Sequence, residues 1–372
     1  MDRRRFLAGA AAAGAAAGAA RLLGVPAGAA VEMEPQSRVK VKEPSKEQQK
    51  TKKKDTDSRP LLYGAGMIWA FWLNRPRSYD LKQMDKLVDL GATLTSATFD
   101  WVDLEKEPGK FDWSYPDHAV EAAQKRGLRQ FGYIGNTAAW ALPPGVTKDK
   151  SYRFPPDDRF RKEFENYCRS VAKRYRGQVE MFQFWNEPNG CSWVNDGCAN
   201  GHEQGLYTKW LKIAYNALKE GNPDCIVAGG ALDYNEGVTE GYRYIEGMYR
   251  YGAKGHFDAI SIHPYHPEGL HWKAVEDTYR VMKEHGDGDK QVWLTEYGWV
   301  DSRGEDAARK LREVLTRLAS PEYRYVTLAN YLCVTDLPIE NTEQYGLCDR
   351  ELNERPIAKA FRELAKGARE RL

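Results

Sequence analysis

The chain has 372 residues, of which 42% are hydrophobic and 12% aromatic, so it can bury a large core and is not disordered throughout. Its net charge of +2 is uneven, because residues 1–30 and 31–59 carry +3 each and residues 60–372 carry −4. A mildly acidic body excludes nucleic acid as a partner. No apolar run reaches the roughly 18 residues of a transmembrane helix, so the mature chain is expected to have no membrane span.

The first thirty residues have the layout of an export signal. Residues 3–7 read Arg-Arg-Arg-Phe-Leu, an Ala/Gly stretch follows, and residues 27–29 form a small-x-small cleavage site. The Arg-Arg-x-Phe-Leu order resembles the bacterial twin-arginine signal, which implies export to the periplasm or the extracellular space. The alternative is a merely basic N-terminus before an Ala-rich helix.

Residues 31–59 are expected to form a flexible, charged linker. They contain no aromatic residue and cannot bury enough apolar surface to offset the entropy lost on ordering. Electrostatic attachment to an acidic surface is the alternative function. Residues 60–372 would then be the folded domain.

From residue 60 onward, short apolar runs alternate about eight times with amphipathic segments. The predicted strands are Leu61–Ile68, Thr93–Thr98, Leu128–Ile134, Val179–Trp185, Cys225–Gly230, Phe257–Ile262, Gln291–Glu296 and Tyr325–Val334. The predicted helices are Leu81–Leu90, Pro116–Arg126, Arg159–Tyr175, Tyr207–Glu220, Val238–Tyr251, Lys273–His285, Glu305–Leu318 and Pro356–Ala368. Alternation of this kind builds parallel sheets, and eight units predict an α/β fold of the (β/α)8 TIM-barrel type. An open doubly wound sheet is the alternative, but residues 61–67 lack its glycine-rich phosphate turn.

Two of the predicted strands end in a carboxylate, where a TIM barrel places its chemistry. Glu187 follows the fourth strand and Glu296 ends the seventh. Packing alone does not explain these residues, since burying an unpaired carboxylate is costly. Glycoside hydrolysis needs two such groups across a cleft, one protonated and one ionised, and like-charge repulsion separates their pKa values. A helix N-terminal carboxylate at Glu187 and a structural ion pair at Glu296 are the alternatives.

Around these carboxylates the sequence resembles the retaining glycoside hydrolases of the (β/α)8 clan that includes families 5 and 39. Residues 186–188 read Asn-Glu-Pro, and Glu296 follows at the seventh strand. Residues 111–114, 261–265 and 345–349 match further pieces of the pattern in order. The resemblance covers essentially all of residues 60–372.

The resemblance implies a role for each residue at the barrel mouth. Glu187 would be the general acid/base and Glu296 the nucleophile. Asn186 would bind the sugar 2-hydroxyl, Tyr265 would contact the nucleophile, and His263 would border the scissile sugar. A structural histidine and a wall tyrosine are the alternatives for the last two.

Two positions depart from the family pattern. Relatives usually carry an arginine near the end of the second strand, where this chain has Ser96. The tryptophan usual at the mouth of strand eight corresponds to Tyr331, which can still stack on a sugar with a smaller face. The missing arginine supports an alternative in which the barrel binds carbohydrate with little or no catalysis.

Tryptophans near the predicted strand ends favour a carbohydrate cleft, since sugar C–H faces pack on indole rings. We assign Trp69, Trp140 and Trp299 to substrate binding, together with Tyr331. At least three of the seven candidates are expected to be structural, and Trp185 and Trp293 are expected in the core. The seven are Trp69, Trp72, Trp101, Trp140, Trp193, Trp272 and Trp299.

The expected function is therefore hydrolysis of β-glycosidic bonds in an oligo- or polysaccharide through a covalent glycosyl-enzyme, with transglycosylation as a variant. No cofactor is expected, and no metal, because the spacing of His263, His266 and Glu268 matches no specific site. We expect a monomer.

Six cysteines in an exported chain allow disulfides. We expect Cys191 and Cys198 to pair and fix the loop after Glu187, and Cys333 and Cys348 form a second candidate pair.

Overall fold

The computed structural model describes residues 60–67, 69–70, 73–192, 203–234, 241–300, 303–337 and 344–369. The predicted signal (1–30) and linker (31–59) lie outside these residues, as do Trp72 and Trp193. The predicted Cys191–Cys198 disulfide also lies outside what is described, since it depends on the Cys191 side chain and on Cys198.

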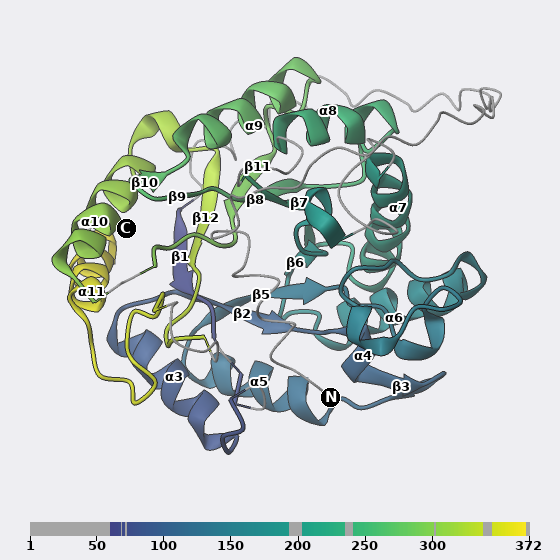
Figure 1. Cartoon of the computed structure of the whole chain (residues 1–372), viewed down its shortest axis with the longest axis horizontal. Coiled ribbons are helices and arrows are strands. Elements are labelled where there is room, and N and C mark those ends of the chain that lie inside the picture. Colours follow the sequence, from purple (N-terminus) through teal and green to yellow (C-terminus); the bar gives the residue numbers. More distant parts are fainter. Residues whose placement is uncertain are drawn as a thin grey trace, which may run out of the picture.

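Eight parallel strands close into a barrel, which confirms the predicted TIM-barrel fold (Figure 1). Their order around the barrel is β1-β12-β11-β8-β7-β6-β5-β2, so the first strand pairs with the last. Each strand corresponds to one predicted apolar run. They are β1 (Leu62–Ala65), β2 (Leu94–Thr98), β5 (Arg129–Ile134), β6 (Met181–Phe184), β7 (Ile226–Asp233), β8 (Ala259–His263), β11 (Gln291–Leu294) and β12 (Val326–Tyr331).

The long helices surround the barrel and cover its outer face (Figure 1). They are α3 (Ser78–Asp89), α5 (Ser114–Lys125), α6 (Arg161–Arg174), α7 (Glu203–Gly221), α8 (Gly241–Arg250), α9 (Trp272–Glu284), α10 (Glu305–Leu318) and α11 (Pro356–Arg369). Within the described part of the chain, no helix has the length and apolar character needed to cross a bilayer.

Short elements that periodicity did not predict sit in the loops between strands and helices. Two-stranded hairpins and single turns are too brief to show a repeating pattern. They are α4 (Trp101–Leu104), β3 (Glu105–Glu107), β4 (Lys110–Phe111), η3 (Ala139–Ala141), η4 (Lys148–Lys150), η5 (Asp158–Phe160), η6 (Pro188–Ser192), β9 (Tyr265–His266), β10 (Gly269–Leu270) and η7 (Pro321–Tyr323).

The helix boundaries follow local chemistry. Helix α10 begins after Gly304 with Glu305 and Asp306 in its first turn and has Arg317 in its last turn, a charge order that complements the helix dipole. Helix α9 is capped by His271, whose Nδ1 accepts the backbone N–H of Ala274 at 3.1 Å. These signals explain why the predicted ends agree with the structure to within a few residues.

The barrel interior changes from apolar to polar along its axis. One buried layer takes a single residue from each of seven strands: Leu94, Phe131, Met181, Ala228, Ala259, Trp293 and Leu328. Side chains two positions further along a strand point to the same face. On β2, β5 and β6 these are Ser96, Tyr133 and Gln183, so the interior becomes polar towards the carboxyl ends of the strands.

The second candidate disulfide is wrong, because Cys333 and Cys348 are both buried free thiols. Cys348 pairs with Thr335 in a parallel bridge, two residues along from Cys333. Such an offset separates the Cα atoms by roughly 8 Å, beyond the reach of a disulfide.

Candidate active site

Glu187 lies on a backbone turn that two neighbouring strands hold in place. Trp185 and Glu187 both have positive φ, 66° and 45°, a conformation that costs about 1–3 kcal/mol for each non-glycine residue. The backbone N–H of Trp185 donates to the carbonyl of Ile134 at 2.8 Å, and that of Glu187 donates to Ala231 at 3.0 Å. The turn therefore depends on β5 on one side and β7 on the other.

An irregularity in β7 supplies the carbonyl that holds Glu187. The pairing of β7 with β8 shifts register between Gly230 and Leu232, and Gly230 has φ of 102°. At the shift, the N–H of Ala231 donates to Oγ of Ser261 at 2.7 Å. Beyond it the strand continues to Asp233, which pairs with His263 at the barrel mouth.

The loop after Glu187 is fastened to the end of β7. Nδ2 of Asn189 donates to the carbonyl of Asp233 at 2.7 Å, and the N–H of Asp233 donates to Oδ1 of Asn189 at 2.9 Å. Both residues are buried. This reciprocal pair fixes the distance between the Asp233 backbone and the turn that carries Glu187.

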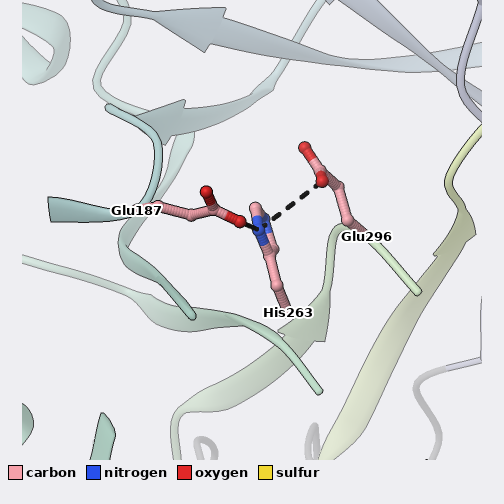
Figure 2. A group of neighbouring side chains, drawn as sticks. All are labelled: Glu187, His263 and Glu296. Carbon is pink, nitrogen blue, oxygen red and sulfur yellow. Dashed lines mark hydrogen bonds and ion pairs between the residues drawn. The ribbon is translucent and has the colours of Figure 1, made fainter. Parts of the chain in front are cut away.

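Glu187, His263 and Glu296 converge on one point (Figure 2). Nδ1 of His263 lies 2.9 Å from Oε1 of Glu187 and 3.6 Å from Oε2 of Glu296. The hydroxyl of Tyr265 donates to Oε2 of Glu296 at 3.0 Å. One oxygen of Glu187 and one of Glu296 are within 4.8 Å of each other, so the two carboxylates meet across His263.

Burial and charge act differently on the two glutamates. The side chain of Glu187 is 9% exposed and that of Glu296 is 21% exposed. Burial, followed by repulsion from Asp233, raises the pKa of Glu187 well above its usual range. Burial also raises the pKa of Glu296, but His263 and the hydrogen bond from Tyr265 oppose the rise. Burial and repulsion therefore both act to raise the pKa of Glu187, whereas the charge of Glu296 has favourable partners.

The second strand reaches the mouth without an arginine. Ser96 is a half-buried residue in the middle of β2, paired with Phe131. Among the described residues, the charges and hydrogen bonds that act on Glu296 come from His263, Glu187, Tyr265 and Asp233. The favourable charge and the hydrogen bond on the Glu296 carboxylate therefore come from a histidine and a tyrosine.

The predicted sugar-binding residues fall into two groups by exposure. Asn186, Trp140 and Tyr265 are half-buried, so their side chains are accessible. His263 is fully buried and approaches both glutamates through Nδ1.

Trp69, Trp299 and Tyr331 are at most 5% exposed, so the stacking face expected of each is covered by the protein. The indole N–H of Trp299 donates to the carbonyls of His266 and Gly269, at 3.1 and 3.0 Å. Trp69 packs edge-on against Tyr115. Packing is the role that the structure gives these rings, which corrects the stacking expectation for all three.

Burial of the other tryptophans agrees with the sequence. Trp101 is fully buried, which brings the structural members of the seven candidates to at least three, as expected. Trp185 and Trp293 lie in the core, also as expected.

Four residues near the mouth were missed by the sequence reasoning. Asp233 ends β7, which was predicted to stop at Gly230. A pair of glycines is typical of a strand end, but in this chain a bulge lets the strand continue. Asp100, Tyr133 and Asn136 form a hydrogen-bonded chain beside β2 and β5. Only Asp100, a charge directly after an apolar strand, carried a signal that could have been found.

Glu187, His263 and Glu296 could also supply three ligands to a divalent cation, since their ligand atoms are within 4.8 Å of one another. His266 and Glu268 are not part of this group, and Nδ1 of His266 accepts the backbone N–H of Glu268 at 3.2 Å in the β9–β10 hairpin. Any cation bound here would occupy the same oxygens that the two carboxylates offer to a sugar.

A closed eight-stranded barrel with two carboxylates meeting at its mouth defines the class of barrel glycoside hydrolases. The sequence model of glycosyl hydrolase family 10 matches residues 79–313, more than half of the chain. The chain belongs to this family. The resemblance to the retaining (β/α)8 clan is thereby confirmed, with family 10 as the family that matches.

Solved structures of several families share the fold. A family 39 glycoside hydrolase from Bacteroides cellulosilyticus WH2 is 20% identical with a TM-score of 0.64, over 83% of this chain and 64% of its own. An exo-β-1,4-mannosidase from Opitutaceae bacterium strain TAV5 is 18% identical with a TM-score of 0.59, over 84% of this chain and 60% of its own. Xylanase 10B from Thermotoga petrophila RKU-1 is 16% identical with a TM-score of 0.58, over 85% and 96%.

The chain thus spans less than two thirds of the first two structures and nearly all of the third. Identities of this size establish the fold alone. No curated protein gives a significant match.

Proposed function

We propose that this chain is a retaining glycosidase that cleaves β-linked oligo- or polysaccharides, with Glu187 as the acid/base and Glu296 as the nucleophile. The observation that carries the proposal is the approach of the two carboxylates to within 4.8 Å. Retaining enzymes hold their carboxyl groups about 5–5.5 Å apart, whereas inverting enzymes leave about 6.5–9.5 Å for a water molecule. Membership of family 10 supports the same reaction.

In the first step, an oxygen of Glu296 attacks the anomeric carbon while Glu187 gives its proton to the departing glycosidic oxygen. The C–O bond to the leaving sugar breaks, and a glycosyl ester on Glu296 forms. In the second step, Glu187 takes a proton from water, the hydroxide attacks the anomeric carbon, and Glu296 leaves as a carboxylate. The raised pKa of Glu187 and the favourable partners of Glu296 suit these roles.

The test compares the wild type with Glu296→Gln and Glu187→Ala on a panel of β-linked oligosaccharides and polysaccharides. Both variants should lose about three or more orders of magnitude in turnover, because covalent and acid–base assistance are removed. The control is Glu220→Gln, an exposed helix residue paired with Arg169, which should keep wild-type activity. NMR of the first product should show the β anomer.

An inverted product would contradict the proposed mechanism. Equal trace activity in the wild type and both variants would instead favour a barrel that binds carbohydrate without cleaving it. Oligosaccharides longer than the substrate, formed in the presence of excess acceptor sugar, would identify transglycosylation by the same two carboxylates.

A further inference from the structure

A polar wall lines the mouth between β2 and β5. Thr98 and Tyr133 are register partners on these neighbouring strands, and both are half-buried. Ser96, two residues before Thr98 and on the same face of β2, is also half-buried. Side chains on inward positions of closed-barrel strands are usually covered completely, so partial exposure here marks the wall as part of the open mouth.

The Tyr133 hydroxyl uses its hydrogen in a hydrogen bond within the protein. It donates to Oδ1 of Asn136 at 3.2 Å, while Nδ2 of Asn136 donates to Oδ1 of Asp100 at 2.7 Å. Thr98 donates to the other oxygen of Asp100 at 2.8 Å. Asn136 and Asp100 are buried, so the amide cannot turn without losing its hydrogen bond to Asp100. The lone pairs of the Tyr133 oxygen are what remains to face a ligand.

The backbone is shaped around the Tyr133 ring. A Cβ atom at Gly135 would lie 2.6 Å from the Tyr133 hydroxyl oxygen and 2.8 Å from the ring carbon that bears it. Asn136 follows with φ of 51°, which turns its amide back towards the phenol. Glycine at one position and a left-handed residue at the next therefore place the hydroxyl at a fixed point.

Tyr133 lies beside the strand that leads to one of the glutamates, because its register partner on β6 is Gln183 and Glu187 follows the end of β6. Burial raises the pKa of Tyr133 well above its usual range, and repulsion from Asp100, Glu296 and Glu187 adds to the rise. The phenol consequently stays neutral and lies in the field of both carboxylates. A sugar held between Glu187 and Glu296 has this wall at one side.

We propose that the Tyr133 oxygen accepts a hydrogen bond from one hydroxyl of the sugar at the point of cleavage and so selects neutral, hydroxylated sugars. This inference rests on the proposed function. The wall offers an acceptor backed by Asp100, and none of the contacts of Asp100, Tyr133 or Asn136 within the described residues involves a cation. A uronic acid would bring its carboxylate beside the two glutamates, and the wall offers it no counter-charge, so such sugars are disfavoured.

The experiment takes the 4-nitrophenyl β-glycoside that the wild type cleaves best, among xyloside, glucoside and mannoside, and its monodeoxy analogues. Tyr133→Phe should lower kcat/KM about tenfold on the parent glycoside. On the one analogue that lacks the recognised hydroxyl, the same substitution should cost less than about twofold, because the hydrogen bond is already gone. The 4-nitrophenyl glucuronide should be cleaved at least about a hundredfold more slowly than the parent by the wild type.

Gly135→Ala is the second variant, since its methyl group pushes the hydroxyl away while keeping the tyrosine. It should lose the same discrimination between parent and deoxy analogue. Tyr215→Phe is the control, because the Tyr215 hydroxyl donates to Asp258 at 3.3 Å, before β8 begins and at the other end of the barrel. It should leave every ratio unchanged.

Circular dichroism first checks that both variants are folded. If Tyr133→Phe then lowers kcat/KM equally on the parent and on every deoxy analogue, the role assigned to Tyr133 is overturned, whereas the proposed function is not. A wild type that cleaves none of the glycosides or polysaccharides overturns the proposed function and this inference with it.

Discussion

The two glutamates at the barrel mouth differ in which neighbours they have. Glu187 is deeply buried, and the charge that adds to the rise in its pKa is that of another carboxylate, Asp233. Glu296 is more exposed and has an imidazole and a phenol within reach of one oxygen. Such an environment suits the roles we propose, with Glu187 as the protonated acid and Glu296 as the charged nucleophile.

At this scale we predict that Asp233→Asn moves the basic limb of the pH profile. Removing the negative charge lowers the pKa of Glu187, so the acid loses its proton at a lower pH and kcat/KM falls earlier as the pH rises. The profile is measured from about pH 4 to 9. Asp224→Asn, at an exposed surface carboxylate, serves as the control, and a basic limb at the same pH in both variants would contradict the assignment of Glu187.

At the scale of the element, the irregular end of β7 positions Glu187, the acid that we propose. The strand is the longest of the barrel, and its register shift gives Ala231 a carbonyl aimed at the N–H of Glu187. Residue 230 must be glycine for two reasons, since its φ is 102° and a Cβ atom there would lie 2.7 Å from the carbonyl oxygen of Ser261.

Gly230→Ala should therefore lower both stability and turnover. We expect a loss of about 1–3 kcal/mol in the free energy of unfolding from strain, and a fall in kcat because the Glu187 turn shifts. Gly255→Ala is the matched control, because Gly255 also has positive φ but nothing within 4 Å of a Cβ atom. Urea melts of both variants measure the free energy of unfolding, and steady-state kinetics measure kcat. A kcat unchanged in Gly230→Ala would show that β7 does not position the acid.

At the scale of the whole molecule, the mouth gathers carboxyl groups that are easier to keep protonated in the folded state. Burial raises the pKa of Asp100 to about 8, and burial also raises those of Glu187 and Glu296. The unfolded chain ionises at lower pH than the folded chain does. Each such group therefore stabilises the fold least at high pH, and stability should decline as the pH rises from about 4 towards 8.

Asp100→Asn should flatten this decline. Between about pH 5 and 7 the folded wild type keeps the Asp100 proton that the unfolded chain has lost, at up to about 1.4 kcal/mol per pH unit. An asparagine can still accept from Asn136 and offer its amide to Thr98, so the fold should survive the change. Thermal melts across this range measure both slopes, and parallel slopes in wild type and variant would refute the prediction.

The local sequence was enough to place eight strand-helix units and to find Glu187 and Glu296. Apolar runs, helix-end charges and carboxylates at strand ends are local signals, and a closed barrel brings all its strand ends to one face. The resemblance to a hydrolase clan added His263 and Tyr265, which the structure brings to the glutamates.

Tertiary structure alone decided the rest of the site. The bulge that carries β7 on to Asp233, and the Tyr133–Asn136–Asp100 chain, arise from pairing between strands far apart in the sequence. Burial of Trp69, Trp299 and Tyr331 was likewise invisible, because whether an aromatic ring faces a ligand or a neighbour depends on which distant segments pack over it. Periodicity records the face on which a side chain lies, whereas its neighbours on that face are set only when the barrel closes.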